Sequence, residues 1–369
     1  MQFHSAGSEA AATAPLAADA ARAERAADWD AAFAAYQRLF WAAMETGDTE
    51  SAASALRGQS RACQQWGRFD DAEEYASLSL EIAERAGHAA AAARAVNTLA
   101  VIRFLQHDWD GAGALYTEAR ERARDCGDDA LVGWTGQNLG VIANLRGDLR
   151  RARALYLESV AAAVRSSDAT TAMAAYNSLG LVCADLEEWT ESGLYFDRGL
   201  ELAEQHGDVG VRATLLSNRA EPLIYIGETA RALATLREAE EIAMQTGDQR
   251  TLSEVNRFRG VIARVAGEDA QAEECLTRAM DLAERAGLEL ERAEAIEELA
   301  RLRWGQGRRG PAHATAREAQ RRYAAIGAAY NATRVESLMA SWAASSAHAP
   351  ATETADDQGI VSPPSTAIY

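Results

Sequence analysis

A small residue, alanine or glycine, recurs every 40 residues along most of this chain, and no other feature constrains the fold as strongly. One column of such residues comprises Ala100, Gly140, Gly180, Ala220, Gly260 and Ala300. Two further columns at the same period are Gly67, Gly147, Gly227, Gly267 and Gly307, and Gly47, Gly87, Gly127, Gly207, Gly247, Gly287 and Gly327. A fixed period of this size is typical of stacked copies of one supersecondary unit. The sequence therefore predicts one elongated repeat domain.

Each period divides into two helical segments separated by short breaks. In one unit, apolar residues recur at helical spacing over 129–146 and again over 150–166, with Gly147-Asp148 between the two segments. Glycine suits the left-handed residue after a helix, and aspartate caps the next helix. The fold is thus expected to be all-α, with antiparallel helix pairs and one capping helix. The pairs are predicted at 9–46, 49–86, 89–126, 129–166, 169–206, 209–246, 249–286 and 289–326, and the cap at 329–344.

The two ends of the chain lack this pattern. Residues 1–8 are expected to be flexible, and residues 345–369 are expected to form a disordered tail, because the tail is polar and has no apolar period. Two alternatives for the tail stay open. Ser362-Pro363-Pro364 could be a short polyproline recognition element, or Ala367-Ile368-Tyr369 could dock, either in trans or in the groove of the same chain as an autoinhibitor.

Composition excludes several classes of partner and chemistry. The formal net charge of −18 opposes binding to nucleic acid and to anionic membrane surfaces. All 37 cationic residues other than histidine are arginine. Without lysine there is no Schiff-base chemistry and no complete Walker A motif. The four cysteines and six histidines are scattered, with no metal-ligand spacing. We therefore expect no cofactor and no metal, and a non-catalytic protein.

The start of the chain has no basic segment followed by an apolar run, and no stretch is long and apolar enough to span a bilayer. We therefore expect a cytoplasmic protein, without a signal peptide or a membrane span.

The spacing of residues within the units carries a family resemblance. Leu139-Gly140 is followed by Ala152, Tyr156 and Ser159, and Leu99-Ala100 by Ala112, Tyr116 and Ala119. A Leu-small pair followed by a small, a large and a small residue at these gaps resembles the tetratricopeptide repeat. The resemblance covers residues 20–344 and implies a right-handed superhelical solenoid of about eight repeats. HEAT and armadillo repeats share the period but lack this arrangement.

The repeats depart from the usual pattern in length and in their ends. Each unit has 40 residues rather than about 34, and Gly-Asp replaces the usual terminal proline. This is similar to the long-repeat branch, which includes kinesin light chains and bacterial peptide-sensing regulators. That resemblance implies that the first helix of each pair lines a concave groove, and that asparagine ladders in the groove hold peptides.

Polar columns of the first helices indicate where a peptide would bind. They are Asn97, Gln137, Asn177, Ser217, Arg257, Glu297; Thr98, Asn138, Ser178, Asn218, Phe258, Glu298; and Phe104, Asn144, Ala184, Ile224, Arg264, Trp304. A carboxamide donates and accepts, so it can pair with a peptide backbone. The predicted peptide-binding amides are Asn97, Gln137, Asn138, Asn144, Asn177 and Asn218, bordered by Arg94 and Trp134. Alternatively, the amides bond to neighbouring helices, and Trp134 is a packing residue between repeats.

A second candidate site contains arginines at positions that are leucine in other repeats. Arg219 and Arg259 replace Leu99, Leu139 and Leu179 of the other units, and Pro222 lies in the middle of a predicted helix. One hypothesis is that Arg219, Arg257 and Arg259 clamp an acidic residue or a C-terminal carboxylate of a partner. The alternative is that Glu221, Glu254 and Glu294 neutralise the arginines, and that Pro222 only bends the solenoid.

These observations favour a non-catalytic scaffold that binds an extended peptide or helix of another protein in its groove. A narrower alternative is a cytoplasmic peptide-sensing regulator that sequesters a partner. An enzyme is the remote alternative, because the sequence contains no metal spacing, phosphate loop or nucleophile elbow.

Overall fold

The computed structural model describes residues 6–347, and side chains over 13–345. In this part of the chain it contains seventeen α-helices and no strand, which confirms the predicted all-α fold. The helices are α1 (Ala6–Arg25), α2 (Trp29–Thr46), α3 (Thr49–Gln65), α4 (Phe69–Arg85), α5 (Ala89–Leu105), α6 (Trp109–Cys126), α7 (Asp129–Leu145), α8 (Leu149–Ser166), α9 (Ala169–Asp185), α10 (Trp189–His206), α11 (Val209–Tyr225), α12 (Thr229–Thr246), α13 (Gln249–Ala266), α14 (Asp269–Arg285), α15 (Glu289–Gly305), α16 (Arg309–Ala325) and α17 (Ala329–Ala347).

The ends of the helical part differ slightly from the prediction. α1 begins at Ala6, inside the segment 1–8 that was expected to be flexible, because the alanine-rich start has a high helix propensity. α17 ends at Ala347, three residues beyond the predicted end of the cap at 344. The expectations for Ser362-Pro363-Pro364 and for the last residues lie outside the described part of the chain.

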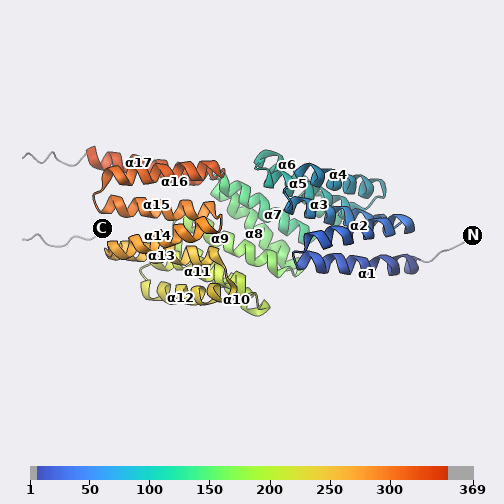
Figure 1. Ribbon diagram of the computed structural model, residues 1–369, viewed down its shortest axis with the longest axis horizontal. Coiled ribbons are helices and arrows are strands. Elements are labelled where there is room, and N and C mark those ends of the chain that lie inside the picture. The colour runs from blue at the N-terminus through green and yellow to red at the C-terminus, as the bar shows by residue number, and fades with distance from the viewer. Residues whose placement is uncertain (1–5, 348–369) are drawn as a thin grey trace, which may run out of the picture.

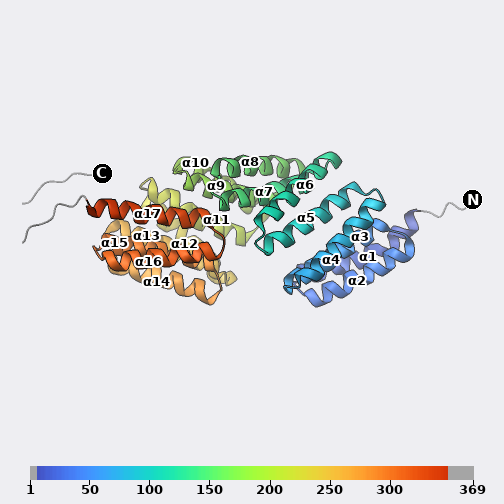
Figure 2. The ribbon, with the colours of Figure 1, turned by 90° about the horizontal axis from the view of Figure 1, so that it is seen from above.

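The helices form pairs that stack into an elongated coil (Figures 1 and 2). Each helix packs against the next one in the chain, and odd-numbered helices also contact each other, for example α3 with α5 and α11 with α13. The odd-numbered helices therefore lie on the inside of the coil, and the even-numbered helices on its outside. This arrangement places the polar columns named above on one inner surface.

The predicted small and large columns meet between the two helices of a pair. An added Cβ at Gly180 would lie 2.5 Å from the Phe196 ring, and one at Gly260 would lie 2.7 Å from Leu276. Gly140 stands in the same way against the buried ring of Tyr156. A side chain at these glycines would displace the large residue, so the helices can approach closely only where a small residue is present.

The Gly-Asp breaks also act as predicted. Gly127 has a φ of +74° and ends α6, and the side chain of Asp128 accepts a hydrogen bond from the backbone N–H of Leu131 at the start of α7. Four breaks among the described residues lack glycine and still adopt the left-handed conformation: Ala27, His107, Ser167 and Glu187 have φ values of 54°, 61°, 56° and 60°. The turn geometry is thus imposed by the repeat even where the residue does not favour it.

The last helix closes the C-terminal part of the coil on itself. α17 packs on α16 and also contacts α7, which lies ten helices earlier in the chain, because the coil curves back on itself. Tyr330 of α17 lies against Gly147, and Arg334 pairs with Asp185 of α9 at 3.4 Å. α7 to α17 therefore form a closed turn of the solenoid with an enclosed inner surface.

Candidate peptide-binding groove

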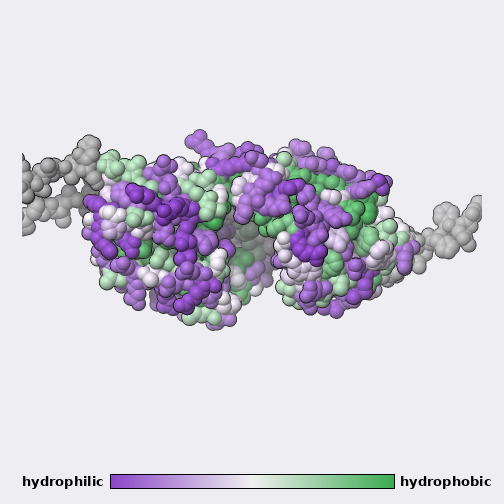
Figure 3. All heavy atoms as spheres, turned by 45° about the horizontal axis from the view of Figure 1, so that its top comes forward, coloured by the Kyte–Doolittle hydropathy of each residue, from purple (hydrophilic) through white to green (hydrophobic). Residues whose placement is uncertain are grey.

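Two hollows lie on the inner surface, one in each half of the coil. The molecular surface is also hollowed between the two halves (Figure 3). The hollow that we call the N-terminal pocket has a volume of about 430 Å³ and lies between α3, α5 and α7. Its lining residues are Ser54, Arg57, Arg61, Gln64, Arg94, Asn97, Thr98, Val101 and Trp134. Three of the predicted site residues, Arg94, Asn97 and Trp134, therefore come together.

The second hollow, which we call the C-terminal cavity, has a volume of about 230 Å³ and lies inside the closed turn. Its charged lining consists of Asp185, Glu221, Glu294, Glu297 and Glu298, with Arg257, Arg301 and Arg334. Asn144 contributes an amide to the same cavity. Of the predicted site residues, Asn144 and Arg257 therefore lie here, away from the N-terminal pocket.

The predicted amides fall into two groups. Asn138 donates to the backbone carbonyl of Trp134 at 2.9 Å, and Asn218 donates to Asn177 at 2.9 Å. Asn177 and Asn218 thus bond between neighbouring helices, as in the alternative interpretation, whereas Asn138 bonds within its own helix α7. The side-chain oxygens of the others, Asn97, Gln137 and Asn144, are buried without a hydrogen-bond partner in the described part of the chain. Gln137 uses only its NH₂ group, which donates to Ser178 at 2.8 Å.

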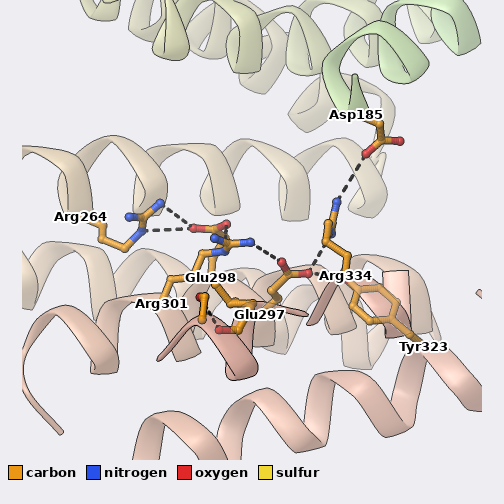
Figure 4. A network of polar contacts seen from close by, with 9 residues as sticks. Asp185, Arg264, Glu297, Glu298, Arg301, Tyr323 and Arg334 are labelled. Atoms are coloured by element: carbon orange, nitrogen blue, oxygen red, sulfur yellow. Dashed lines mark hydrogen bonds and ion pairs between the residues drawn. The ribbon is translucent and has the colours of Figure 1, made fainter. Parts of the chain in front are cut away.

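A hydrogen-bonded ion network fills one side of the C-terminal cavity (Figure 4). Glu297, only 3% exposed, accepts hydrogen bonds from Arg301 at 2.7 Å, from Arg334 at 2.8 Å and from Tyr323 at 3.1 Å. Arg264 pairs with Glu298 at 2.9 Å. Since Arg334 also reaches Asp185, this network ties the cap helix α17 to both α15 and α9.

Burial perturbs the carboxyl groups around this network. It raises the pKa of Asp185 to about 6 and that of Glu221 to about 7, although nearby arginines partly offset the effect. Burial likewise raises the pKa of Glu254 to about 8, against the opposing effect of Arg257. A carboxyl group taken out of water favours its neutral form. At neutral pH the cavity therefore holds protons as well as ion pairs.

The predicted clamp of three arginines is not formed. Arg219 pairs with Asp197 of α10 at 2.6 Å, and Arg259 makes two hydrogen bonds to Glu240 of α12 at 2.8 and 2.6 Å. Arg257 instead faces the C-terminal cavity and pairs with Glu294 at 3.3 Å. Residues two apart on a helix point about 200° away from each other, so Arg257 and Arg259 cannot grip one group.

Internal pairing, the alternative interpretation, describes these arginines better. Glu294 is one of the partners expected for Arg257, whereas Asp197 and Glu240 were not expected as partners. Arg219 and Arg259 occupy the leucine column that packs against the preceding outer helix. Carboxylates of that helix form ion pairs with them. Pro222 lies inside α11, which continues to Tyr225.

Sequence reasoning missed the central residues of the N-terminal pocket, although the signal was present. Moving one period back from Asn97 gives Arg57, and moving back from Phe104 gives Gln64. Both residues line the pocket. The polar columns given above begin in the third pair, so they do not include these two residues of the second pair.

Comparisons with known proteins agree with this architecture. A tetratricopeptide-repeat family model matches residues 90–163, which lie in α5 to α8. Curated protein sequences contain no match to this chain.

Solved structures share the fold at low sequence identity. The apo form of RapI aligns with a TM-score of 0.57 and 13% identity, over 74% of this chain and 98% of RapI. The apo form of the quorum sensor NprR from B. thuringiensis aligns with a TM-score of 0.57 and 19% identity, over 70% of this chain and 73% of NprR. A Rap protein complexed with competence and sporulation factor aligns with a TM-score of 0.56 and 12% identity, over 91% of this chain and 98% of that protein. The chain is therefore a TPR-like solenoid, as the resemblance implied.

No helix among the described residues is both long and apolar enough to cross a bilayer. These residues contain no group of three or more His, Cys, Asp or Glu side chains placed to hold a metal ion.

Proposed function

We propose that this protein is an interaction scaffold that binds an extended peptide segment of a partner protein along its inner surface. The observation that carries the proposal is the set of buried, unpartnered amide oxygens of Asn97, Gln137 and Asn144. A buried acceptor without a donor is unfavourable. Backbone N–H groups of an extended peptide would supply donors along the inner helices α5 and α7.

The likeness to known structures supports the same class of function. One of the matched structures is the Rap conjugation gene regulator of the plasmid pLS20 in complex with the Phr* peptide, and NprR is described as a quorum sensor. The fold of this chain provides an inner surface of the same kind. A partner with an acidic residue or a free C-terminal carboxylate would match the unpartnered Arg57 of the N-terminal pocket.

Selection from a random peptide library displayed on phage, with the full chain immobilised, tests the proposal. Enriched peptides are then synthesised, and their affinities are measured by fluorescence polarisation. We expect the triple variant N97A/Q137A/N144A to bind them at least about tenfold more weakly, since each lost hydrogen bond contributes about 1 kcal/mol. A matched control, Q37A/Q205A/Q245A, removes three exposed amides from the outer helices and should leave the affinity unchanged. Failure to enrich any peptide, or equal binding by both variants, contradicts the proposal.

A cytoplasmic peptide-sensing regulator is a second candidate, favoured by the contact between α17 and α7. A peptide that enters the closed turn would have to alter this contact, and the change could release or sequester a partner. Small-angle scattering with a selected peptide is expected to show a change in the radius of gyration. An unchanged radius at saturating peptide would leave only the simple scaffold.

A further inference from the structure

Arg57 of α3 is a buried cation without a counter-charge. Its side chain lines the N-terminal pocket, and the residue is only 9% exposed. Its Nη1 atom is buried without a hydrogen-bond partner, and no carboxylate of the described residues lies within ion-pair distance. Burial, together with Arg61 and Arg94, lowers the pKa of Arg57 to about 10, so the guanidinium still carries its charge at neutral pH.

The other two arginines of the pocket are already neutralised. Arg61 makes two hydrogen bonds to Glu24, at 2.5 and 2.9 Å. Hydrogen bonds from Arg61 and Tyr36 outweigh burial and lower the pKa of Glu24, which therefore stays ionised. Arg94 pairs with Asp128 at 2.9 Å. The pocket thus has a surplus of about one positive charge, located on Arg57.

The electrostatic surroundings of Arg57 do not change this balance. Glu50 is the acid that acts on Arg57 through space, but it forms no ion pair with it. Burial and the hydrogen bond to Glu24 raise the pKa of Tyr36 to about 12, so its phenol is neutral at pH 7. An isolated charge in such a position is expensive unless a ligand compensates it.

The rest of the pocket suits a peptide residue rather than a free ion. Trp134 is 44% exposed and forms an apolar wall with Val101. Asn97 offers its unpartnered amide oxygen on the same helix as Val101. The volume of about 430 Å³ has room for a carboxylate and a neighbouring apolar side chain together.

We propose that the N-terminal pocket is an anion subsite in which Arg57 binds a single carboxylate of a peptide, with an adjacent apolar side chain on Trp134. This rests on the proposed peptide-binding function and moves the acid-binding site from Arg219, Arg257 and Arg259 to the other half of the groove. Arginine recognises a carboxylate through two parallel N–H groups. A surplus of one charge matches a carboxylate and leaves a phosphate dianion half compensated.

Arginine side-chain NMR of the full chain tests the subsite directly. The Nε–H signal of Arg57 is assigned by its loss in R57Q and followed during titration with sodium acetate, sodium phosphate at pH 7.5 and sodium chloride at matched ionic strength. We expect a saturable shift with acetate in the millimolar range, and none with chloride. Equal shifts with chloride and acetate, or phosphate binding more than tenfold tighter than acetate, would overturn the assignment.

Three blocked dipeptides separate the sources of the carboxylate. N-acetyl-Leu-Glu-amide carries a side-chain carboxylate, N-acetyl-Ala-Leu a C-terminal one, and N-acetyl-Leu-Gln-amide none. Either acidic dipeptide should shift Arg57 at lower concentration than acetate does, because its leucine contacts Trp134. A neutral dipeptide that shifts Arg57 as strongly as both acidic ones excludes carboxylate recognition.

Matched variants distinguish binding from structure. R57Q should weaken binding of the acidic dipeptide by at least about tenfold, as read from the backbone amide shifts of α5, and R57K by less, since lysine keeps the charge without the planar fork. R150Q removes an exposed arginine of α8 and should have no effect. The melting temperature of R57Q should not fall, because an uncompensated buried charge is removed; a fall would assign Arg57 a structural role instead. If the acidic dipeptide binds at Arg57 but the phage selection yields no peptide, the subsite is supported and only the longer peptide interface is contradicted.

Discussion

The N-terminal pocket and the C-terminal cavity occupy equivalent places on the inner helices, yet the charged lining of the pocket is arginine alone, whereas that of the cavity includes both signs. The column that places Arg57 in the pocket continues to Arg257 and Glu297 in the cavity. The column of Arg61 continues to Glu221 and Arg301, and that of Arg94 to Glu254, Glu294 and Arg334. The repeat therefore fixes where a side chain lies, whereas the residue in each copy decides what that place can bind.

The two regions also differ in how their charges are balanced. Arg61 and Arg94 of the pocket pair with acids, whereas Arg57 remains without a partner. The cavity has five lining carboxylates and three lining arginines. Its excess of negative charge is reduced by hydrogen bonds shared between these groups and by the raised pKa values of its carboxyl groups. We infer that the cavity contributes to stability, while the pocket is kept for a ligand.

The largest expected effect follows from removing the central carboxylate of the cavity. E297Q keeps the shape of the side chain but leaves Arg301 and Arg334 without their shared acceptor charge. Breaking a buried pair on one side costs about 3–5 kcal/mol. We expect a loss of about 3 kcal/mol in the free energy of unfolding, measured by urea denaturation, since Glu298 and Asp185 still face the two arginines.

A matched control for this variant is E336Q, which changes an exposed glutamate of α17. It should alter the unfolding free energy by no more than about 0.5 kcal/mol. If E297Q were as mild as E336Q, the cavity would not be the stabilising half of the molecule, and the comparison between the two regions would fail.

The next effect is the pH dependence of stability. Glu221 and Glu254 have folded-state pKa values raised to about 7 and about 8, so the native state holds protons that the unfolded state releases. Their stabilising contribution is fully present below the unfolded pKa near 4.5 and is lost as the pH rises through 7 and 8. The slope is at most about 1.4 kcal/mol per pH unit for each proton.

Thermal melting of E221Q/E254Q between pH 5.5 and 9 measures this contribution. We expect the melting temperature of the wild type to fall toward alkaline pH, and that of the double variant to fall much less, because glutamine has no proton to release. Parallel curves for the two proteins would mean that these carboxyl groups are ionised in the folded state, contrary to the burial argument.

Much of this architecture could be predicted from the sequence because each repeat contacts mainly its neighbours. The same local packing rules hold in every copy. They require small residues at positions such as Gly180 and Gly260, and left-handed breaks at Gly127 and its equivalents. The closure of α17 onto α7 could not be predicted in this way. It depends on a small rotation per repeat that accumulates over several pairs, and only then does Tyr330 reach Gly147.

The candidate site was predictable in position but not in pairing. The columns correctly placed Asn97 and Gln137 on the inner helices, and one further step back along them would have found Arg57. Which charges meet is a different question. The choice of Asp197 and Glu240 as partners of Arg219 and Arg259 follows from how the outer helices face the leucine column, which the spacing alone does not specify.

The smallest expected effect concerns the paired arginines at the rim of the N-terminal pocket. The Arg94 side chain is 54% exposed, so solvent and salt reach its side of the ion pair, although the partner Asp128 is only 9% exposed. Pairs of this kind contribute about 0–1 kcal/mol. R94Q should therefore change the unfolding free energy by less than about 0.5 kcal/mol at physiological salt, measured by the same urea denaturation as for E297Q. A loss close to that of E297Q would show that the pocket, like the cavity, is built for stability, and it would remove the reason for regarding the unpartnered Arg57 as reserved for a ligand.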